Sequence, residues 1–403
     1  VSNTTKTFCY TVSGGDTANI VFTLQNTELV WFVDVAAGAG GVGNQARPFQ
    51  TLAAAVGVDT AGDTIFVEHN AASYTCGISL LPNEKLIGEG SGSNLDTLAG
   101  IAPVAGSSFP TLTNNSAQWP TLTAAGADCV ALSTGNTIRG FNFGNVGSSN
   151  TAIVGSGFVT LTVNDAAIAT NGQALNLING TVNAAFGSVS SSGGLLNNVR
   201  LVTIVGTVDL GNSGALTGAG SGVAFVVSGG TEAITYGGSI TASRSIDIQT
   251  HSSGNITLSG ALLSTSANSG IFISGNTGGT ITLSGAKTVS SGANPAVTLT
   301  NNTGATINFT GGGLAISTTG GTGFSAAGGG TVNVTGTGNT IVSTTGTALN
   351  VANTNIGASG LTFQSISANG AANGIVLNNT GASGGVTVTG NSAGLCGGSV
   401  SSG

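Results

Sequence analysis

Charge is the property that this sequence has least of. Only 5% of its 403 residues are Asp, Glu, Lys or Arg, whereas soluble domains usually carry about 25%. Seven basic residues against 14 acidic ones give a formal net charge of -7. Because so few basic residues cannot form the positive surface that a nucleic acid requires, we exclude nucleic acid as a partner.

The few charges also end early in the chain. The last acidic residue is Asp247 and the last basic one is Lys287, so that beyond Lys287 only Cys396 has an ionisable side chain. General acid–base catalysis needs a side chain that gains or loses a proton. We therefore expect no such chemistry in the C-terminal part of the chain.

Proline and long apolar runs are scarce as well. Six prolines and the absence of a Gly-X-Y register exclude collagen. No apolar run approaches the roughly 18 residues of a membrane span, so we expect no membrane insertion. The chain starts at Val1 without Met and ends on Gly-Gly-Ser-Val-Ser-Ser-Gly, which we interpret as an internal fragment of a longer protein.

Cysteine is rare, with Cys9, Cys76, Cys129 and Cys396 far apart in the sequence. This spacing does not fit a CxxC metal clip, and only two His are present to help. We therefore predict no metal site and no cofactor. A Cys76–Cys129 disulfide in a secreted chain and a buried free thiol are both consistent with the sequence.

Short alternating segments fill most of the chain from about residue 137 onward. Examples are Thr-Ile-Thr-Leu-Ser at 280–284, Ala-Val-Thr-Leu-Thr at 296–300 and Thr-Ile-Asn-Phe-Thr at 306–310. Apolar residues that alternate with Thr, Ser or Asn indicate strands with one buried and one wet face. No helical periodicity is present in this region, so the pattern predicts an all-β fold.

A longer repeat overlies this alternation. Segments that end in Asn276, Asn302, Asn353 and Asn379 share the order small, apolar, x, apolar, x, and lie about 25 residues or a multiple of this apart. Three strands and three turns fit into one repeat, which predicts a parallel β-helix with one repeat per rung. The Asn would suit a left-handed corner and could stack in a ladder. A β-sandwich or barrel is the competing fold.

The first third of the chain differs from the repeats. Arg-Pro-Phe-Gln-Thr-Leu-Ala-Ala-Ala-Val at 47–56 predicts one short helix, with Pro48 in its first turn and apolar positions at 49, 52, 53 and 56. We expect this helix to cap the open end of the coil, since an uncovered rung exposes apolar interior and a free strand edge. No equivalent cap is evident at the C-terminal end.

Residues 1–27 form a predicted unit of their own. Two strand patterns joined by a Gly-Asp turn, near 7–13 and 18–24, indicate a hairpin that ends a preceding β-sandwich or forms a linker. Residues 28–403 are then the parallel β-helix, with roughly 13 to 15 rungs and a length of about 65 Å.

Two resemblances refine this reading. Phe-Cys-Tyr-Thr-Val-Ser-Gly-Gly-Asp at 8–16 resembles the closing hairpin of bacterial cadherin-like or immunoglobulin-like repeats, although its Asp-Gly order is altered. Trp-Phe-Val-Asp at 31–34, Pro-Phe-Gln-Thr-Leu at 48–52, Gly-Asp-Thr-Ile-Phe-Val at 62–67 and Leu-Ile-Gly-Glu-Gly at 86–90 resemble the entry rungs of pectin-lyase-like right-handed parallel β-helices of large bacterial surface proteins. That superfamily contains lyases, hydrolases and adhesins, so the fold does not decide the function.

Four residues are the candidates for catalysis. A glycoside hydrolase needs two carboxylates roughly 5 to 9.5 Å apart, and Asp209 and Glu232 are separated by about one rung. A lyase needs a basic residue, and Asp247 and His251 are expected to point outward on one strand, about 13 Å apart. Because that separation is too wide for a pair, and because Asp209 and Glu232 fit solvated surface charges, we predict no catalytic site.

Other polar features receive structural interpretations. Glu68, His69, Glu84, Lys85 and Glu89 could form a metal or sugar site, but we expect them to bond across the domain junction. The glycine-rich segment at 88–92 has neither the Lys nor the helix of a phosphate loop. Trp31 is expected in the core, and Trp119 is isolated. Outward Thr rows such as 387–389 are too irregular for an ice-binding face.

These observations favour a protein that is not an enzyme. We predict a rigid structural or adhesive segment of an extracellular bacterial surface protein or filament, located outside the cell or on its surface, with a role in adhesion, biofilm matrix or fibre formation. The expected partners are neighbouring domains or subunits of the same fibre, with glycans as a further class. A polysaccharide-acting lyase or hydrolase is the alternative.

Overall fold

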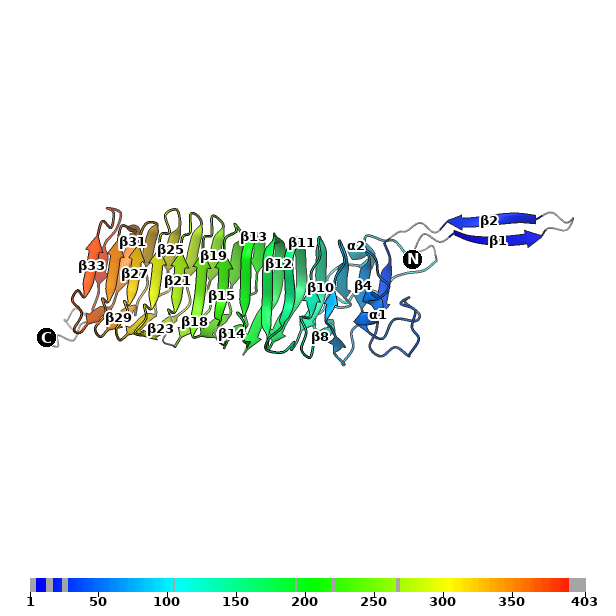
Figure 1. Cartoon of the computed structure of the whole chain (residues 1–403), viewed down its shortest axis with the longest axis horizontal. Coiled ribbons are helices and arrows are strands. Elements are labelled where there is room, and N and C mark those ends of the chain that lie inside the picture. Colours follow the sequence, from blue (N-terminus) through cyan, green and yellow to red (C-terminus); the bar gives the residue numbers. More distant parts are fainter. Residues whose placement is uncertain are drawn as a thin grey trace.

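The chain forms one long stack of short strands in a computed structural model (Figure 1). The structure describes residues 5–11, 17–23, 28–103, 106–192, 194–218, 220, 222–265 and 269–390, with backbone only for 5–11 and 17–23. Strands β3 to β34 belong to a single continuous sheet of 32 strands, and β1 and β2 form a separate two-stranded sheet.

The strands fall into an irregular early group and three regular faces. The early strands are β3 (Val30–Val33), β4 (Thr64–Val67), β5 (Tyr74–Thr75), β6 (Ile78–Ser79), β7 (Lys85–Gly88), β8 (Thr121–Thr123), β9 (Val130–Ala131), β10 (Asn136–Phe143), β11 (Thr151–Thr170), β12 (Gln173–Ser192) and β13 (Val199–Asp209). The first face contains β15 (Val223–Ser228), β18 (Arg244–Gln249), β21 (Ile271–Ser274), β24 (Val297–Thr300), β27 (Phe324–Ala327), β30 (Leu349–Ala352) and β33 (Ile375–Asn378). The second contains β16 (Ala233–Tyr236), β19 (Asn255–Leu258), β22 (Thr280–Leu283), β25 (Thr306–Phe309), β28 (Thr331–Val334), β31 (Asn355–Phe363) and β34 (Val386–Val388). The third contains β14 (Ala215–Thr217), β17 (Ser239–Ala242), β20 (Leu262–Ser264), β23 (Lys287–Gly292), β26 (Leu314–Thr318), β29 (Thr340–Ser343) and β32 (Ser365–Ala368).

Each regular strand pairs in parallel with the strand three places further along the chain. For example, β18 pairs with β21, β19 with β22 and β20 with β23. One turn of the coil therefore contains three strands, and about 13 turns of about 25 residues follow one another. The predicted parallel β-helix is confirmed, and the competing sandwich or barrel is excluded, because antiparallel pairing in the sheet of β3 to β34 would be its signature.

Alternation along the strands fills the interior with stacked apolar columns. Ile246, Ile271, Val297, Phe324 and Leu349 are consecutive partners in the first-face ladder, and all are fully buried. The interior columns form one continuous apolar cluster that extends from Val33 to Phe363. This burial of one side of each strand is the main favourable term in folding.

Left-handed residues turn the chain at one corner of the coil. Thr250, Asn301, Asn353 and Asn379 have φ values of 55°, 57°, 50° and 51°, and each directly follows a first-face strand. Asn adopts this conformation more readily than other residues that carry a Cβ. In addition, the Asn379 side chain donates a hydrogen bond to Asn353 Oδ1 at 3.0 Å. The prediction is confirmed for Asn353 and Asn379, which are left-handed and stack on each other. Asn276 and Asn302 instead follow the left-handed residues Gly275 and Asn301 and are buried.

A short helix, α1 (Leu52–Val56), lies against the first strands at the N-terminal end of the coil (Figure 1). Leu52 and Ala55 enter the core, while Phe49 and Val56 pack against it. The helix is shorter than the predicted 47–56, because Thr51 accepts a hydrogen bond from the Ala54 N–H and acts as the N-cap. Pro48 consequently precedes the helix, and Ala53 is exposed instead of buried.

A second helix, α2 (Leu95–Ala99), was not predicted and shows that the expectation of a single helix was wrong. It belongs to an excursion from the coil between β7 and β8, residues 89–120, which also contains the 3-10 turn at Ser116–Gln118. Leu95 and Ala99 cover the outward side chains Phe32, Phe66 and Ile87 of three neighbouring turns. The alternation rule assigns these three positions to solvent, but the excursion buries them in a second apolar cluster.

Near the N-terminus, strands β1 (Thr5–Thr11) and β2 (Thr17–Thr23) form the predicted antiparallel hairpin.

The last described turn of the coil has an open side. The predicted absence of a C-terminal cap concerns residues 391–403, which lie outside the described residues. Within the described part, Ile375 and Leu377 of β33 are 46% and 48% exposed, although their ladder partners Leu349 and Val351 are buried.

A disulfide joins Cys76 and Cys129, which resolves the two alternatives that the sequence left open. The two cysteines are 53 residues apart in the chain but adjoin each other between turns, because the Cys76 N–H donates to the Thr123 carbonyl and the Gly77 N–H donates to the Cys129 carbonyl. Cys9 and Cys396 have side chains outside the described part of the chain. The bond closes a long loop around the irregular early turns.

We predict that the Cys76→Ser/Cys129→Ser double variant is less stable than the parent protein. A bridge across 53 residues removes unfolded-state entropy worth about 4 kcal/mol. Urea unfolding followed by circular dichroism would show the lower midpoint. As a control, reductant should lower the midpoint of the parent and leave that of the variant unchanged, and equal midpoints for parent and variant would contradict the prediction.

Candidate functional site

The two carboxylates proposed for hydrolysis do not form a pair. Asp209, at the end of β13, is exposed and accepts hydrogen bonds from the Gly211 N–H and from the Thr235 hydroxyl at 3.0 and 2.8 Å. Glu232 has no exposed surface and lies inside the coil. The expectation that Glu232 is a solvated surface charge was therefore wrong, because the Gly229–Gly230 corner turns the residues before β16 inward.

His251 also lies inside the coil, contrary to the expectation that it faces outward with Asp247. The φ of 55° at Thr250 ends the alternation of β18, so the next side chain enters the interior instead of continuing the outer row. Asp247 is on the outer side, where the Arg244 guanidinium contacts it at 2.7 Å and the Gln249 amide donates to it at 2.7 Å. Asp247 and His251 are thus separated by the wall of the coil.

His251 starts a buried polar column at this corner. Its backbone N–H donates to Asn276 Oδ1 at 2.8 Å, and the Asn276 side chain donates to Asn302 Oδ1 at 2.8 Å. All three side chains are buried. The column satisfies backbone groups that the sharp corner leaves without ladder partners, which is the usual requirement for buried polar groups.

Glu232 lies beside His251, the first residue of this column. Its Oε2 atom is 3.7 Å from His251 Nδ1, and both of its carboxylate oxygens and His251 Nε2 lack a hydrogen-bond partner. Desolvation raises the pKa of Glu232 to about 7 and lowers the pKa of His251. Because both shifts favour the uncharged forms, the contact is not a strong ion pair at neutral pH.

We predict that Glu232 makes the protein less stable as the pH rises from about 4.5 towards 7. The folded protein keeps this proton up to a pKa of about 7, whereas the unfolded chain releases it near the model value of 4.5. The folded state binds more protons in this window, so the free energy of unfolding decreases with rising pH. His251, with its lowered pKa, acts in the opposite direction below pH 6.5.

The Glu232→Gln variant isolates this contribution. Thermal unfolding at a series of pH values should show a smaller loss of stability between pH 4.5 and 7 in the variant than in the parent. Asp209→Asn is the matched control, since it makes the same kind of change at an exposed carboxylate on the outside of the coil. Parallel profiles for parent and Glu232→Gln would refute the assignment.

Lys287 is a second ionisable group inside the coil. It occupies an inward column between Leu262 and Leu314 and is 1% exposed. Its ammonium group donates to the carbonyls of Leu283 and Thr310 at 3.2 and 2.8 Å, and desolvation lowers its pKa to about 8. Asn339, further along this part of the coil, donates to the Thr335 and Thr362 carbonyls in the same manner, so Lys287 has a corner-bonding role.

We predict that Lys287 makes the protein more stable as the pH rises from about 8 to 10.5. The unfolded chain holds the proton up to the model value of 10.5, while the folded protein releases it near 8. The unfolded state binds more protons in this window, so the free energy of unfolding increases with pH. Denaturant midpoints at pH 8 and 10 should therefore differ less in Lys287→Met than in the parent, and an identical difference would disprove the effect.

The charged residues near the N-terminal end form hydrogen bonds and ion pairs within the first turns of the coil. Lys85 reaches the Ala99 carbonyl at 2.6 Å and Glu28, at the start of the coil, at 3.9 Å. Glu89 accepts from the His69 N–H at 2.6 Å. The Glu68 pKa is raised by desolvation and by nearby acidic groups. These contacts all lie within the coil, and bonding across the junction to residues 1–27 stays a prediction, because the side chains of those residues lie outside the described part of the chain.

Asp63 and Glu84 form a buried acidic cluster in the entry turns, of which the sequence singled out only Glu84. Asp63 accepts from the Leu29 N–H and from the Trp31 indole at 2.7 and 2.8 Å, and so ties β3 to the following turn. Glu84 accepts from the Leu81 N–H at 2.7 Å. Burial, with a smaller contribution from the neighbouring Asp59 carboxyl group, raises the Glu84 pKa to about 9. This cluster holds the entry turns together.

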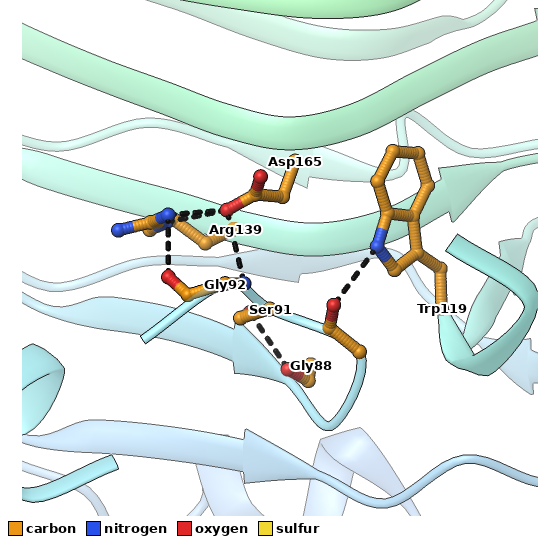
Figure 2. A network of polar contacts seen from close by, with 7 residues as sticks. Gly88, Ser91, Gly92, Trp119, Arg139 and Asp165 are labelled. Carbon is orange, nitrogen blue, oxygen red and sulfur yellow. Dashed lines mark hydrogen bonds and ion pairs between the residues drawn. The ribbon is translucent and has the colours of Figure 1, made fainter. Parts of the chain in front are cut away.

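The glycine-rich segment at 88–92 is fixed by a polar network (Figure 2). Arg139 of β10 binds Asp165 of β11 and also donates to the Gly92 carbonyl at 2.8 Å. The Trp119 indole donates to the Gly90 carbonyl at 3.2 Å. Arg139 thus ties this segment to β10, and Trp119 ties it to the end of the excursion, which gives the segment a structural role.

The outer Thr and Asn rows are interrupted, as expected. On the second face, Thr257, Thr282, Asn308 and Asn333 are consecutive ladder partners. Asn333 donates to Asn308 Oδ1 at 2.9 Å, so these amides bind each other. In the part of the chain that the structure describes, no group of three or more His, Cys, Asp or Glu is arranged to hold a metal ion, and no helix is long and apolar enough to cross a membrane.

Comparisons with known proteins add no family. No protein-family model, curated protein or solved structure matches this chain. The parallel coil is therefore established by its own ladder and core, and the site residues are interpreted from their geometry alone. The chain is a parallel β-solenoid of about 13 turns.

Proposed function

We propose that this chain is a rigid structural or adhesive segment of a large extracellular bacterial surface protein or filament. The observation that carries this proposal is the unbroken ladder from β3 to β34 with one continuous apolar core. At about 4.8 Å per turn, some 13 turns make a rod of roughly 60 Å. A rigid rod of this kind keeps the domains at its two ends at a fixed distance, which suits a spacer.

The disulfide supports the extracellular location. Cys76 and Cys129 are bonded, and disulfides persist in oxidising compartments such as the cell surface. The sparse charge also fits an extended scaffold more than a catalytic cleft, since Arg139 and Arg244 are neutralised by carboxylates and Lys287 is buried. A pectin-lyase-like class for the coil and a cadherin-like origin for the hairpin belong to this proposal.

Labelling of intact cells tests the proposal. We expect antibodies against residues 28–390 to label cells that express the native protein without permeabilisation. Alkylation with a mass-shifting maleimide should leave Cys76 and Cys129 unmodified before reduction. Labelling that requires permeabilised cells, together with free thiols at both positions, would contradict an extracellular structural role.

An activity screen separates this function from the alternative of a polysaccharide lyase or hydrolase. The purified protein should show no turnover of pectins, alginates or other acidic glycans. Turnover that is abolished by Asp209→Ala or Glu232→Ala, with the fold retained, would replace the structural proposal by an enzymatic one. Asp96→Ala, in the exposed N-terminal turn of α2, is the control variant for such a loss.

A further inference from the structure

Arg200 is an isolated positive charge on the outer face of the coil. Between Asp165 and Glu232 the sequence contains only Arg200 and Asp209 as charged residues. Glu232 is buried in the interior and Asp209 bonds to Gly211 and Thr235. The Arg200 guanidinium instead donates to Asn176 Oδ1 at 3.1 Å, which is an uncharged acceptor.

Arg244 serves as a comparison, because its guanidinium is neutralised by a carboxylate. It lies on β18 of the first face, contacts Asp247 Oδ2 at 2.7 Å and lies over the Phe272 ring, 5.2 Å from its centroid. Asp247 occupies the outer ladder column that continues from Arg200 through Val226. The protein thus provides a carboxylate for Arg244, and an amide for Arg200.

Arg200 also lines a hollow in the surface of about 410 Å³. Its lining includes the amide residues Gln173 and Asn176 and the apolar residues Leu195 and Leu196. These two leucines are 59% and 41% exposed. Large apolar side chains placed next to an unneutralised guanidinium combine the two features by which a pocket holds an amphiphilic anion.

We propose that this hollow binds a small monocarboxylate with an aliphatic group. The planar guanidinium presents several N–H donors that match the two oxygens of a carboxylate, and it keeps its charge at any physiological pH. Leu195 and Leu196 then cover the aliphatic part of the ligand. A dianion such as phosphate fits less well, because one cation balances only part of its charge and the leucines would contact polar oxygens.

Amide side chains hold the lining of the hollow in place. Asn176 accepts a hydrogen bond from the Arg200 guanidinium. Gln173 Oε1 accepts from the Thr151 hydroxyl at 3.3 Å, and Asn197 accepts from the Val223 N–H at 2.7 Å, which ties these two lining residues to neighbouring turns. The inference goes beyond the proposed structural role and does not depend on it.

Paired titrations with hexanoate and hexanamide test the site, because the two probes differ in charge but hardly in shape. By isothermal titration calorimetry at low salt, we expect hexanoate to bind the parent at least about tenfold more tightly than hexanamide, the effect of one charge-assisted contact. Arg200→Gln should reduce hexanoate binding to the level of hexanamide. Arg244→Gln, a change of the same kind at a neutralised arginine, should leave hexanoate binding unchanged.

A double leucine variant tests the apolar half of the site. Leu195→Ala/Leu196→Ala alters only exposed side chains, so the fold should be kept, and it should weaken hexanoate binding while leaving acetate binding as in the parent. Equal binding of hexanoate and hexanamide by the parent would overturn the proposal. So would equal losses in Arg200→Gln and Arg244→Gln, or undiminished hexanoate binding by the leucine double variant.

Discussion

The parallel ladder between successive turns is the constraint on which the rest of the structure depends. Because β18 pairs with β21 and β19 with β22, each position in a turn lies directly above its equivalent in the preceding one. A side chain therefore points into or out of the coil together with its whole column. This coupling explains how so many small side chains build a continuous core, since each column buries its apolar atoms along the full length of the coil.

The corners of the coil need hydrogen bonds that the ladder does not provide. A sharp turn leaves backbone groups without ladder partners, and buried side chains provide the missing bonds: Asn276 and Asn302 at one corner, and Lys287 and Asn339 at another. Glu232 and His251 occupy the same kind of environment but leave several of their polar atoms without partners. The titratable groups with strongly shifted pKa values thus lie at structural positions of the coil, where burial is the cause of the shift.

The few outward charges have structural uses at the N-terminal turns and become isolated further along. Arg139 with Asp165 and Lys85 with Glu28 hold the excursion and the first turns in place. Past that region, Arg244 has its carboxylate and Arg200 does not. A solenoid that needs almost no charge for its own stability makes such an unmatched guanidinium a clear candidate for an external ligand.

The sequence alone determined the all-β class, the repeat of about 25 residues and the left-handed Asn corners, because alternation and periodicity are local properties that the ladder preserves. It also placed Asp209 on the surface. Only the tertiary structure decided that Glu232 and His251 are inside, since the left-handed Gly229 and Gly230 turn the chain before Glu232 and the left-handed Thr250 reverses the alternation before His251. Extending the repeat to 245–251 would have aligned His251 with Asn276, to which its N–H donates. Helix α2, the acidic cluster and the hollow at Arg200 could not be predicted, because each depends on contacts between segments of different turns.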